Sequence, residues 1–171
     1  MPSERRLTRR SASTPSVRPS RAQGTSRRCC SRGRVADRVY VIVVGGGTVG
    51  YYLSRDLVER GHEVTLIERD GKRADWLETQ LGSIVMRGDG CEVRFLAQTG
   101  IERADAIIAV TADDEDNLIA LQMAKKHFKV KKTIARVNNP TNVEIFKMLG
   151  VDEAVSATEV LLGALEPPLT T

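Results

Sequence analysis

The sequence contains no run of apolar residues that approaches the ~20 needed to cross a bilayer as a helix. It has only three cysteines and two histidines, and neither group has the spacing of a disulfide framework or of a metal site. No serine or cysteine has an evident neighbouring base, as a catalytic nucleophile would require. We therefore expect a soluble protein of a reducing cytosol, without bound metal or enzymatic activity, whose role at any membrane would require a partner.

Positive charge is concentrated in the first 36 residues. They contain ten arginines and one acidic residue, whereas the rest of the chain contains 16 basic and 21 acidic residues. Because this segment is rich in Arg, Ser and Pro and poor in large apolar residues, we expect residues 1–36 to form a disordered basic tail. Three interpretations remain: a nucleic-acid-binding arm, a transit peptide, or a non-native extension. We favour the extension and expect no nucleic-acid partner.

An apolar strand runs directly into a glycine-spaced turn at residues 39–50, VYVIVVGGGTVG. Gly45, Gly47 and Gly50 satisfy G-x-G-x-x-G, and the following YYLSRDLVER predicts a helix. Gly45 allows a sharp turn, Gly47 admits a pyrophosphate against the backbone, and Gly50 allows close packing of helix on strand. The helix N-terminus adds unpaired N–H groups and partial positive charge, so the pattern predicts a dinucleotide-type phosphate site.

An acidic residue follows at the distance where such sites hold the ribose. The segment HEVTLIERD predicts a second strand, and Glu68 lies near its end, 21 positions after Gly47. Dinucleotide sites place an acid about 20 residues beyond the glycines. We expect Glu68 to bind the ribose hydroxyls; the other interpretation is an ordinary solvated carboxylate at a strand end.

From residue 38 onward, strands and helices alternate with short joints, the pattern of a parallel sheet covered on both faces. The sequence predicts an α/β fold over residues 37–156: a Rossmann-like, doubly wound parallel sheet of about six strands with helices on both faces. Strands are expected at 39–44, 63–68, 83–87, 105–110, 132–137 and 153–156, and helices at 48–60, 71–81, 91–98, 114–127 and 140–149. The buried stripes expected for the first and last of these helices are Val49, Leu53 and Leu57, and Val143, Phe146 and Leu149.

Polar residues follow the later strands, at the edge where ligands of such sheets bind. The third strand leads into RGDG at 87–90, the fourth into TADDEDN at 111–117, and the fifth contains Arg136 and is followed by Asn138 and Asn139. The acidic run 113–116 has two interpretations. It is either a divalent-cation site or, as we favour, a helix start at which carboxylates complement the dipole.

The chain resembles a known family over residues 38–165. The motifs that carry the resemblance are VVGGGTVGYYL, VTLIERD, RGDG, ADAIIAVTADDEDNLIALQMAK, IARVNNP and FKMLGVDEAVSATEVL. GDG, T-x-D-D-x-x-N and ARVNNP together are far more specific than the glycines. They resemble the RCK, or TrkA N-terminal (TrkA-N), domain of potassium-transport regulators.

This resemblance implies a cytosolic, nucleotide-sensing regulatory subunit that docks on a membrane-embedded potassium transporter or channel of the Trk/Ktr type. Such a subunit lies in the cytoplasm, peripherally at the inner face of the plasma membrane, and forms homo-oligomers, either dimers or octameric rings. Bound NAD(H), ATP or ADP shifts its conformation and thereby gates potassium uptake. The alternative is an NAD(P)-dependent oxidoreductase, or the cofactor-binding fragment of one.

The motifs and the resemblance together give a set of expected nucleotide-binding residues. They are Gly45, Gly46, Gly47, Thr48, Val49, Gly50, Glu68, Arg69, Gly88, Asp89, Gly90, Thr111, Ala112, Asp113 and Arg136. ATP-responsive members often carry an arginine where this chain has Thr48, so we expect NAD(H) ahead of ATP or ADP. Residues 157–171 resemble the start of a connecting helix, and the family's C-terminal ligand-binding subdomain is absent. We expect either a stand-alone N-terminal domain or a truncated chain.

Overall fold

The computed structural model describes residues 38–165, so the expected basic tail lies outside the described residues. Six strands form one sheet in the order β3-β2-β1-β4-β5-β6, and every pair of neighbours is parallel. The predicted Rossmann-like α/β fold is confirmed. The elements are β1 Tyr40–Val44, α1 Thr48–Glu59, β2 Glu63–Glu68, α2 Gly71–Leu81, β3 Val85–Arg87, α3 Val93–Gln98, β4 Ala106–Ala109, α4 Asp114–His127, β5 Lys132–Val137, α5 Val143–Met148, β6 Glu153–Ser156 and α6 Ala157–Leu165.

The position of β1 determines where a ligand can enter. β1 pairs with β2 on one side and with β4 on the other, so the chain reverses its direction across the sheet between β3 and β4. Connections leave the carboxyl ends of β1 and β4 on opposite faces, which opens a crevice between those ends. The polar segments after these two strands therefore meet at one place.

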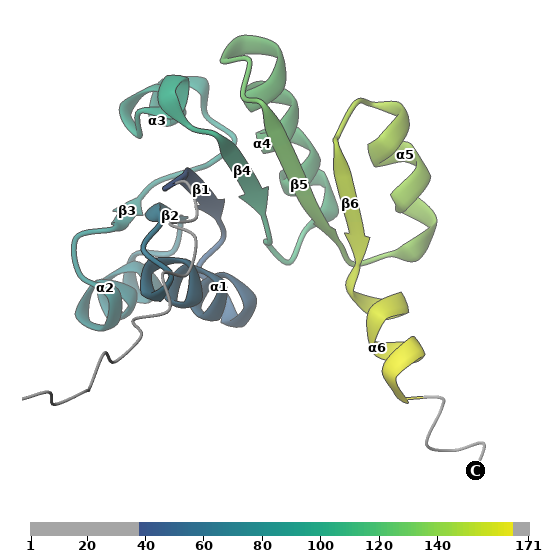
Figure 1. Cartoon of the computed structure of the whole chain (residues 1–171), viewed down its shortest axis with the longest axis horizontal. Coiled ribbons are helices and arrows are strands. Elements are labelled where there is room, and N and C mark those ends of the chain that lie inside the picture. The colour runs from purple at the N-terminus through teal and green to yellow at the C-terminus, as the bar shows by residue number, and fades with distance from the viewer. Residues whose placement is uncertain (1–37, 166–171) are drawn as a thin grey trace, which may run out of the picture. The chain divides into compact units, whose positions relative to one another are not determined.

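Alternating residues of β1 divide the core into two layers. Val41 and Val43 pack with Leu66 and Leu77 beneath α1 and α2. Ile42 and Val44 face the opposite side, in the larger core that includes residues of α3, α4 and α5. Figure 1 shows α1 and α2 together at the lower left, apart from α3 and α4 at the top. Both faces of the sheet thus carry helices, as the alternation predicted.

The predicted stripe residues at the ends of two helices are partly wrong. Val49 is 45% exposed and Leu149 is 46% exposed, although Phe146 is buried as expected. Val49 lies in the first turn of α1 and borders an open apolar groove, and Leu149 follows the last residue of α5. The predicted helix 140–149 also begins as a 3-10 turn, Pro140–Asn142, and a second such turn, Ile101–Arg103, was not predicted. No described helix is long and apolar enough to span a membrane.

Candidate functional site

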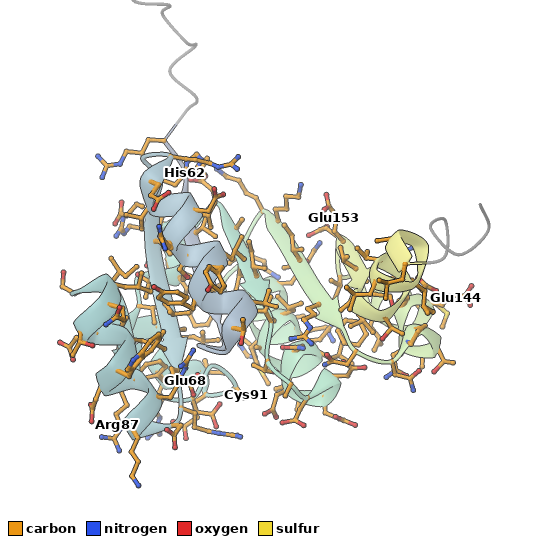
Figure 2. The ribbon with its side chains drawn as sticks, turned by 90° about the horizontal axis from the view of Figure 1, so that it is seen from below. His62, Glu68, Arg87, Cys91, Glu144 and Glu153 are labelled. Carbon is orange, nitrogen blue, oxygen red and sulfur yellow. The ribbon has the colours of Figure 1, made fainter. Side chains whose placement is uncertain are left out.

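A cleft of about 300 Å³ opens at the carboxyl ends of β1 and β4. The glycine turn, the end of β2, the RGDG turn and the loop after β4 all contribute to its wall. Its lining residues are Val44, Gly45, Gly47, Ile67, Glu68, Arg69, Gly88, Asp89, Gly90, Cys91, Val110, Thr111, Ala112, Asp113, Asp116 and Arg136. In Figure 2 the labelled Glu68 and Cys91 lie at the end of the sheet opposite His62, which places His62 away from this cleft.

The lack of a side chain has a different consequence at each of the three spaced glycines. Gly45 has φ +106°, a left-handed conformation that other residues rarely adopt. A Cβ on Gly50 would lie 1.8 Å from the carbonyl oxygen of Gly45, so α1 can approach this turn only without a side chain there. A Cβ on Gly47 would meet no atom within 4 Å. The turn is therefore closed at Gly50 and open at Gly47, directly before the N-terminus of α1.

Glu68 is held at the end of β2 by two backbone amides. The N–H of Gly46 donates to Glu68 Oε2 at 2.7 Å, and the N–H of Asp70 donates to Glu68 Oε1 at 2.8 Å. A carboxylate offers about four acceptor positions, so two remain for a ligand. The carboxylate is thus fixed beside the glycine turn with free accepting capacity, as a ribose diol would require.

Gly46 closes the turn from the side of α2. A Cβ at this position would lie 2.3 Å from Leu77 Cδ1 and 2.7 Å from Glu68 Oε2. Its carbonyl oxygen accepts a hydrogen bond from Arg73 Nε at 2.8 Å. The guanidinium of Arg73 also stacks over the ring of Trp76. α2 therefore positions the glycine turn, through a residue 27 positions away that the sequence pattern did not identify.

The RGDG turn forms a second rigid wall. Asp89 Oδ1 accepts from the N–H of Cys91 at 2.8 Å, which orders the turn before α3. A Cβ on Gly88 would collide with the ring of Phe95 at 2.2 Å, and one on Gly90 with Val44 Cγ1 at 2.4 Å. The two glycines are needed because the turn packs directly on β1 and α3.

Asn117, fully buried in α4, joins the ends of β4 and β5. Its Oδ1 accepts from the N–H of Thr111 at 2.9 Å and from the hydroxyl of Thr111 at 2.8 Å. Its Nδ2 donates to the carbonyl oxygen of Arg136 at 3.0 Å. The T-x-D-D-x-x-N and ARVNNP motifs are thus two parts of one hydrogen-bonded unit.

Asp114 completes that unit with four hydrogen bonds. Its Oδ1 accepts from the backbone N–H and from Nδ2 of Asn138, at 2.7 and 3.0 Å. Its Oδ2 accepts from the N–H of Asn139 at 3.1 Å and from Nδ2 of Asn142 at 2.9 Å. Burial alone would raise the pKa of Asp114, but these hydrogen bonds to the ionised form outweigh it and lower the pKa.

Charges around the cleft are unequally paired. Arg69 Nη1 lies 3.9 Å from Asp89 Oδ2 and 3.5 Å from Asp116 Oδ2, so this arginine faces two carboxylates of the wall. Arg136 is half-buried, and its Nε is buried without a hydrogen-bond partner among residues 38–165. An anion entering the cleft would thus find Arg136 less engaged than Arg69.

Residues 41–157 match the family model of the TrkA-N domain. The chain belongs to the TrkA-N domain family. The resemblance of its motifs to this family is thereby confirmed. The Trk system potassium uptake protein TrkA of Mycobacterium tuberculosis is 38% identical over 131 residues, which cover 76% of this chain and 59% of the relative. The chain spans about three-fifths of the length of this relative and of the TrkA homolog of Methanothermobacter thermautotrophicus.

Solved structures share the fold of this TrkA-N domain. The GsuK RCK domain is 26% identical with a TM-score of 0.67, over 78% of this chain and 29% of the other. The GsuK channel bound to NAD is 24% identical with a TM-score of 0.63, over 74% and 23% of the two chains. At 24% identity the second likeness supports the fold alone.

The cleft of the TrkA-N domain gathers most of the expected nucleotide-binding residues. Gly46, Thr48, Val49 and Gly50 are the exceptions, since they do not line it. Gly46 and Gly50 shape the turn from behind, whereas Val49 lines a different, apolar groove. The remaining expected residues all lie in its wall. Two further polar residues line the cleft: Asp116, which belongs to the acidic run 113–116, and Cys91, which directly follows the RGDG turn.

The acidic run 113–116 lies at the start of α4. Within residues 38–165, no group of three or more His, Cys, Asp or Glu side chains is arranged to hold a metal ion. Asp113 is the N-cap residue of α4 but makes no side-chain cap bond, and Asp114 binds the β5 loop instead. The favoured interpretation is thus refined: one carboxylate of the run joins two loops.

Cys91 is expected to react slowly with alkylating agents. Its burial, followed by the charges of Asp89 and Asp116, raises the pKa of the thiol to about 11, so the nucleophilic thiolate is scarce at neutral pH. Peptide-resolved mass spectrometry after iodoacetamide treatment at pH 7.5 should show alkylation at least ~10-fold slower than for a free cysteine. Rapid modification of Cys91 at this pH would contradict the prediction.

Proposed function

We propose that this TrkA-N domain is a nucleotide-sensing part of a potassium-transport system and that it binds NAD(H) in the cleft between β1 and β4. The observation that carries the proposal is the glycine turn, open at Gly47 and flanked by the fixed carboxylate of Glu68. Gly47 precedes the N-terminus of α1, where backbone amides and the helix dipole favour phosphate. The pyrophosphate lies at this N-terminus and the adenosine ribose hydroxyls bind Glu68.

NAD(H) is preferred to ATP or ADP for two reasons of charge. Thr48 stands where an arginine could reach a terminal phosphate, and a threonine supplies no such charge. Four carboxylates line the cleft, from Glu68, Asp89, Asp113 and Asp116, against the two guanidinium groups of Arg69 and Arg136. A pyrophosphate diester carries fewer negative charges than a triphosphate and meets less repulsion there. GsuK, which shares this fold, has been solved with NAD and also with ADP, so those structures do not decide between the two nucleotides.

The expected partner is a membrane-embedded potassium transporter or channel subunit, as the names of the relatives suggest. The domain then lies in the cytoplasm, at the inner face of the plasma membrane, and works as a homo-oligomer. Nucleotide shifts the population of two conformations because it binds one of them more tightly, and no bond of the nucleotide is made or broken. The role is binding and switching rather than oxidoreductase chemistry.

Gly47→Ala tests the pyrophosphate position. Because a Cβ at this position meets no atom within 4 Å in the free domain, we expect the melting temperature without ligand to change by less than about 2 °C. The same Cβ occupies the space that the pyrophosphate needs. Titration calorimetry should therefore show at least ~10-fold weaker NADH binding, a loss of about 1.4 kcal/mol.

A control separates this effect from a general change in the helix. Lys126→Ala also introduces an alanine, at an exposed position near the end of α4 that does not line the cleft, so NADH affinity should be unchanged. Wild-type affinity of Gly47→Ala for NADH would contradict the proposed position of the pyrophosphate. Absence of any binding of NADH, ATP or ADP to the wild-type protein would contradict the proposed function itself.

A further inference from the structure

An apolar groove lies on the α1 face of the sheet, over the strands that α1 and α2 leave uncovered. It measures about 410 Å³ and is bounded by α1 on one side and α6 on the other. In Figure 1 these two helices lie on either side of the lower ends of β4 and β5. Its wall includes Val49, Ile108, Ile134, Val155, Leu161 and Arg136.

α6 covers this groove only partly. None of its residues is buried, and Val160, Leu161 and Leu165 are each 60% or more exposed. α6 begins at Ala157 directly after β6 ends at Ser156, so no linker separates helix and sheet. Closer packing of α6 would bury these side chains against the apolar wall, which is favourable in proportion to the apolar area removed from water.

Arg136 is the one charged residue in this groove wall, and it also lines the nucleotide cleft. β5 alternates, so that Thr133, Ala135 and Val137 are buried toward α4 while Ile134 and Arg136 rise on the groove face. The Nε of Arg136 is buried and unpartnered among the described residues. The side chain of Arg136 thus borders both the groove and the cleft, and its Nε has no hydrogen-bond acceptor among the described residues.

Covering a charged group with apolar side chains is unfavourable unless the charge is paired. Without an anion in the cleft, the guanidinium of Arg136 opposes packing of α6 over the groove. An anion bound in the cleft pairs this charge and draws it toward the cleft side, which removes the opposition. The two events therefore favour each other, and the coupling is reciprocal.

The first turn of α6 is already fastened to the loop that carries this arginine. The hydroxyl of Thr158 donates to the carbonyl oxygen of Asn138 at 2.9 Å, and Ser156 Oγ accepts from the N–H of Glu159 at 3.2 Å. Asn138 is in turn bound by Asp114. The start of α6 is fixed while its remaining turns are exposed, so the helix can change its angle about its own first turn.

We propose that Arg136 couples nucleotide in the cleft to α6: the ligand's phosphate pairs with this guanidinium, and α6 then packs over the apolar groove. The proposal rests on the proposed function for its ligand, but it assigns the conformational response to one residue and one helix. In this scheme Arg136 is a positioning residue for α6 as well as a ligand contact.

Hydrogen–deuterium exchange of the full chain tests the proposal, with NADH as the probe. In the wild type, saturating NADH should slow exchange of amides 160–165 at least about fivefold, the lower end of typical coupling. The neutral variants Arg136→Leu and Arg136→Gln should show this slow exchange without nucleotide, because the opposing charge is gone. Arg136→Lys keeps the charge and should exchange as the unliganded wild type does.

Arg94→Leu is the matched control, since Arg94 is exposed on α3 and lines neither space. It should leave exchange of α6 unchanged with and without NADH. Unchanged α6 exchange in both neutral variants, or NADH binding by the wild type without a change at α6, would overturn the coupling and leave the proposed function standing. Failure of NADH to bind the wild type would overturn the proposed function and the ligand part of the coupling with it.

Discussion

Gly50→Ala is expected to destabilise the domain by about 3 kcal/mol and to abolish nucleotide binding. The new Cβ would lie 1.8 Å from the carbonyl oxygen of Gly45 and 3.0 Å from its carbonyl carbon. Backbone atoms cannot rotate away as a side chain can, so either α1 or the glycine turn must shift. We therefore expect a destabilisation at the upper end of the range of about 1–3 kcal/mol that is usual for overpacking. Thermal unfolding should show a melting temperature lower by roughly 10 °C.

Gly163→Ala is the comparison for this prediction. Gly163 lies in α6 with no atom within 4 Å of an added Cβ, and alanine favours helix over glycine by about 1 kcal/mol. We expect its melting temperature to be equal to or above that of the wild type. If Gly50→Ala were as stable as Gly163→Ala, the close approach of α1 to the glycine turn would be wrong.

Asp114→Ala is expected to cost about 3 kcal/mol or more. The substitution removes the acceptor of four hydrogen bonds and leaves amides of Asn138, Asn139 and Asn142 without it. Hydrogen bonds to a charged group contribute about 1.5–3 kcal/mol each, and they are not additive within one network. The urea concentration at the unfolding midpoint should be lower for Asp114→Ala than for the wild type. Hydrogen–deuterium exchange of the backbone amides at 138 and 139 should be faster.

The same carboxylate predicts a pH dependence. The pKa of Asp114 is lowered in the folded domain, so the unfolded chain binds its proton more readily than the folded one. The contribution of Asp114 to the stability of the domain is therefore present above the pKa of this residue in the unfolded chain, about 3.9. It is lost as the pH falls through the lower pKa of the folded domain. Unfolding midpoints measured between pH 7 and pH 3 should fall more steeply for the wild type than for Asp114→Ala.

Asp113→Ala is the matched control for both measurements. Asp113 is exposed, neighbours Asp114 and makes no side-chain cap bond. Replacement of Asp113 should change the free energy of unfolding by less than about 0.5 kcal/mol, as for other surface sites. A loss at Asp113 equal to that at Asp114 would show that charge at the start of α4 matters, rather than the hydrogen bonds to the β5 loop.

The fold could be predicted almost completely because its signals are local. The alternation of strand and helix patterns acts within a few residues of each boundary. Gly61, with φ +88°, follows the end of α1, and Asn139 Oδ1 accepts from the N–H of Thr141 at the turn before α5. Boundaries were less accurate where tertiary packing decides them. β3 has three residues rather than five, because only Val85–Arg87 pair with β2.

The exposed residues Val49 and Leu149 were mispredicted for a related reason. Spacing by four identifies the apolar side of a helix but does not reveal whether other elements cover that side. Val49 lies over the groove that α1 leaves open, and Leu149 comes after α5 has ended. Both positions depend on the placement of neighbouring elements, which periodicity does not contain.

Within the site, motif residues could be identified and their partners could not. The glycines and Glu68 belong to a pattern with a fixed spacing, so the sequence locates them. The bond from Arg73 to Gly46 spans 27 positions, and those from Asp114 reach 24 to 28 positions along the chain. Such contacts follow from the strand order, which brings distant segments together. From the sequence alone, Asp114 is explained adequately as an acid at a helix start, so its bonds to the loop after β5 could not be predicted.

The bonds between Asp114 and the three asparagines bear on how this domain can diverge. One carboxylate serves Asn138, Asn139 and Asn142 at once, so a replacement at 114 alone leaves three partners unsatisfied. Two of the four donors are backbone N–H groups, which any residue except proline supplies, so only the side chains of Asn138 and Asn142 are matched to the acid. Positions 114, 138 and 142 are thus expected to change together during evolution, whereas the residue at 139 is not tied to the acid through its side chain.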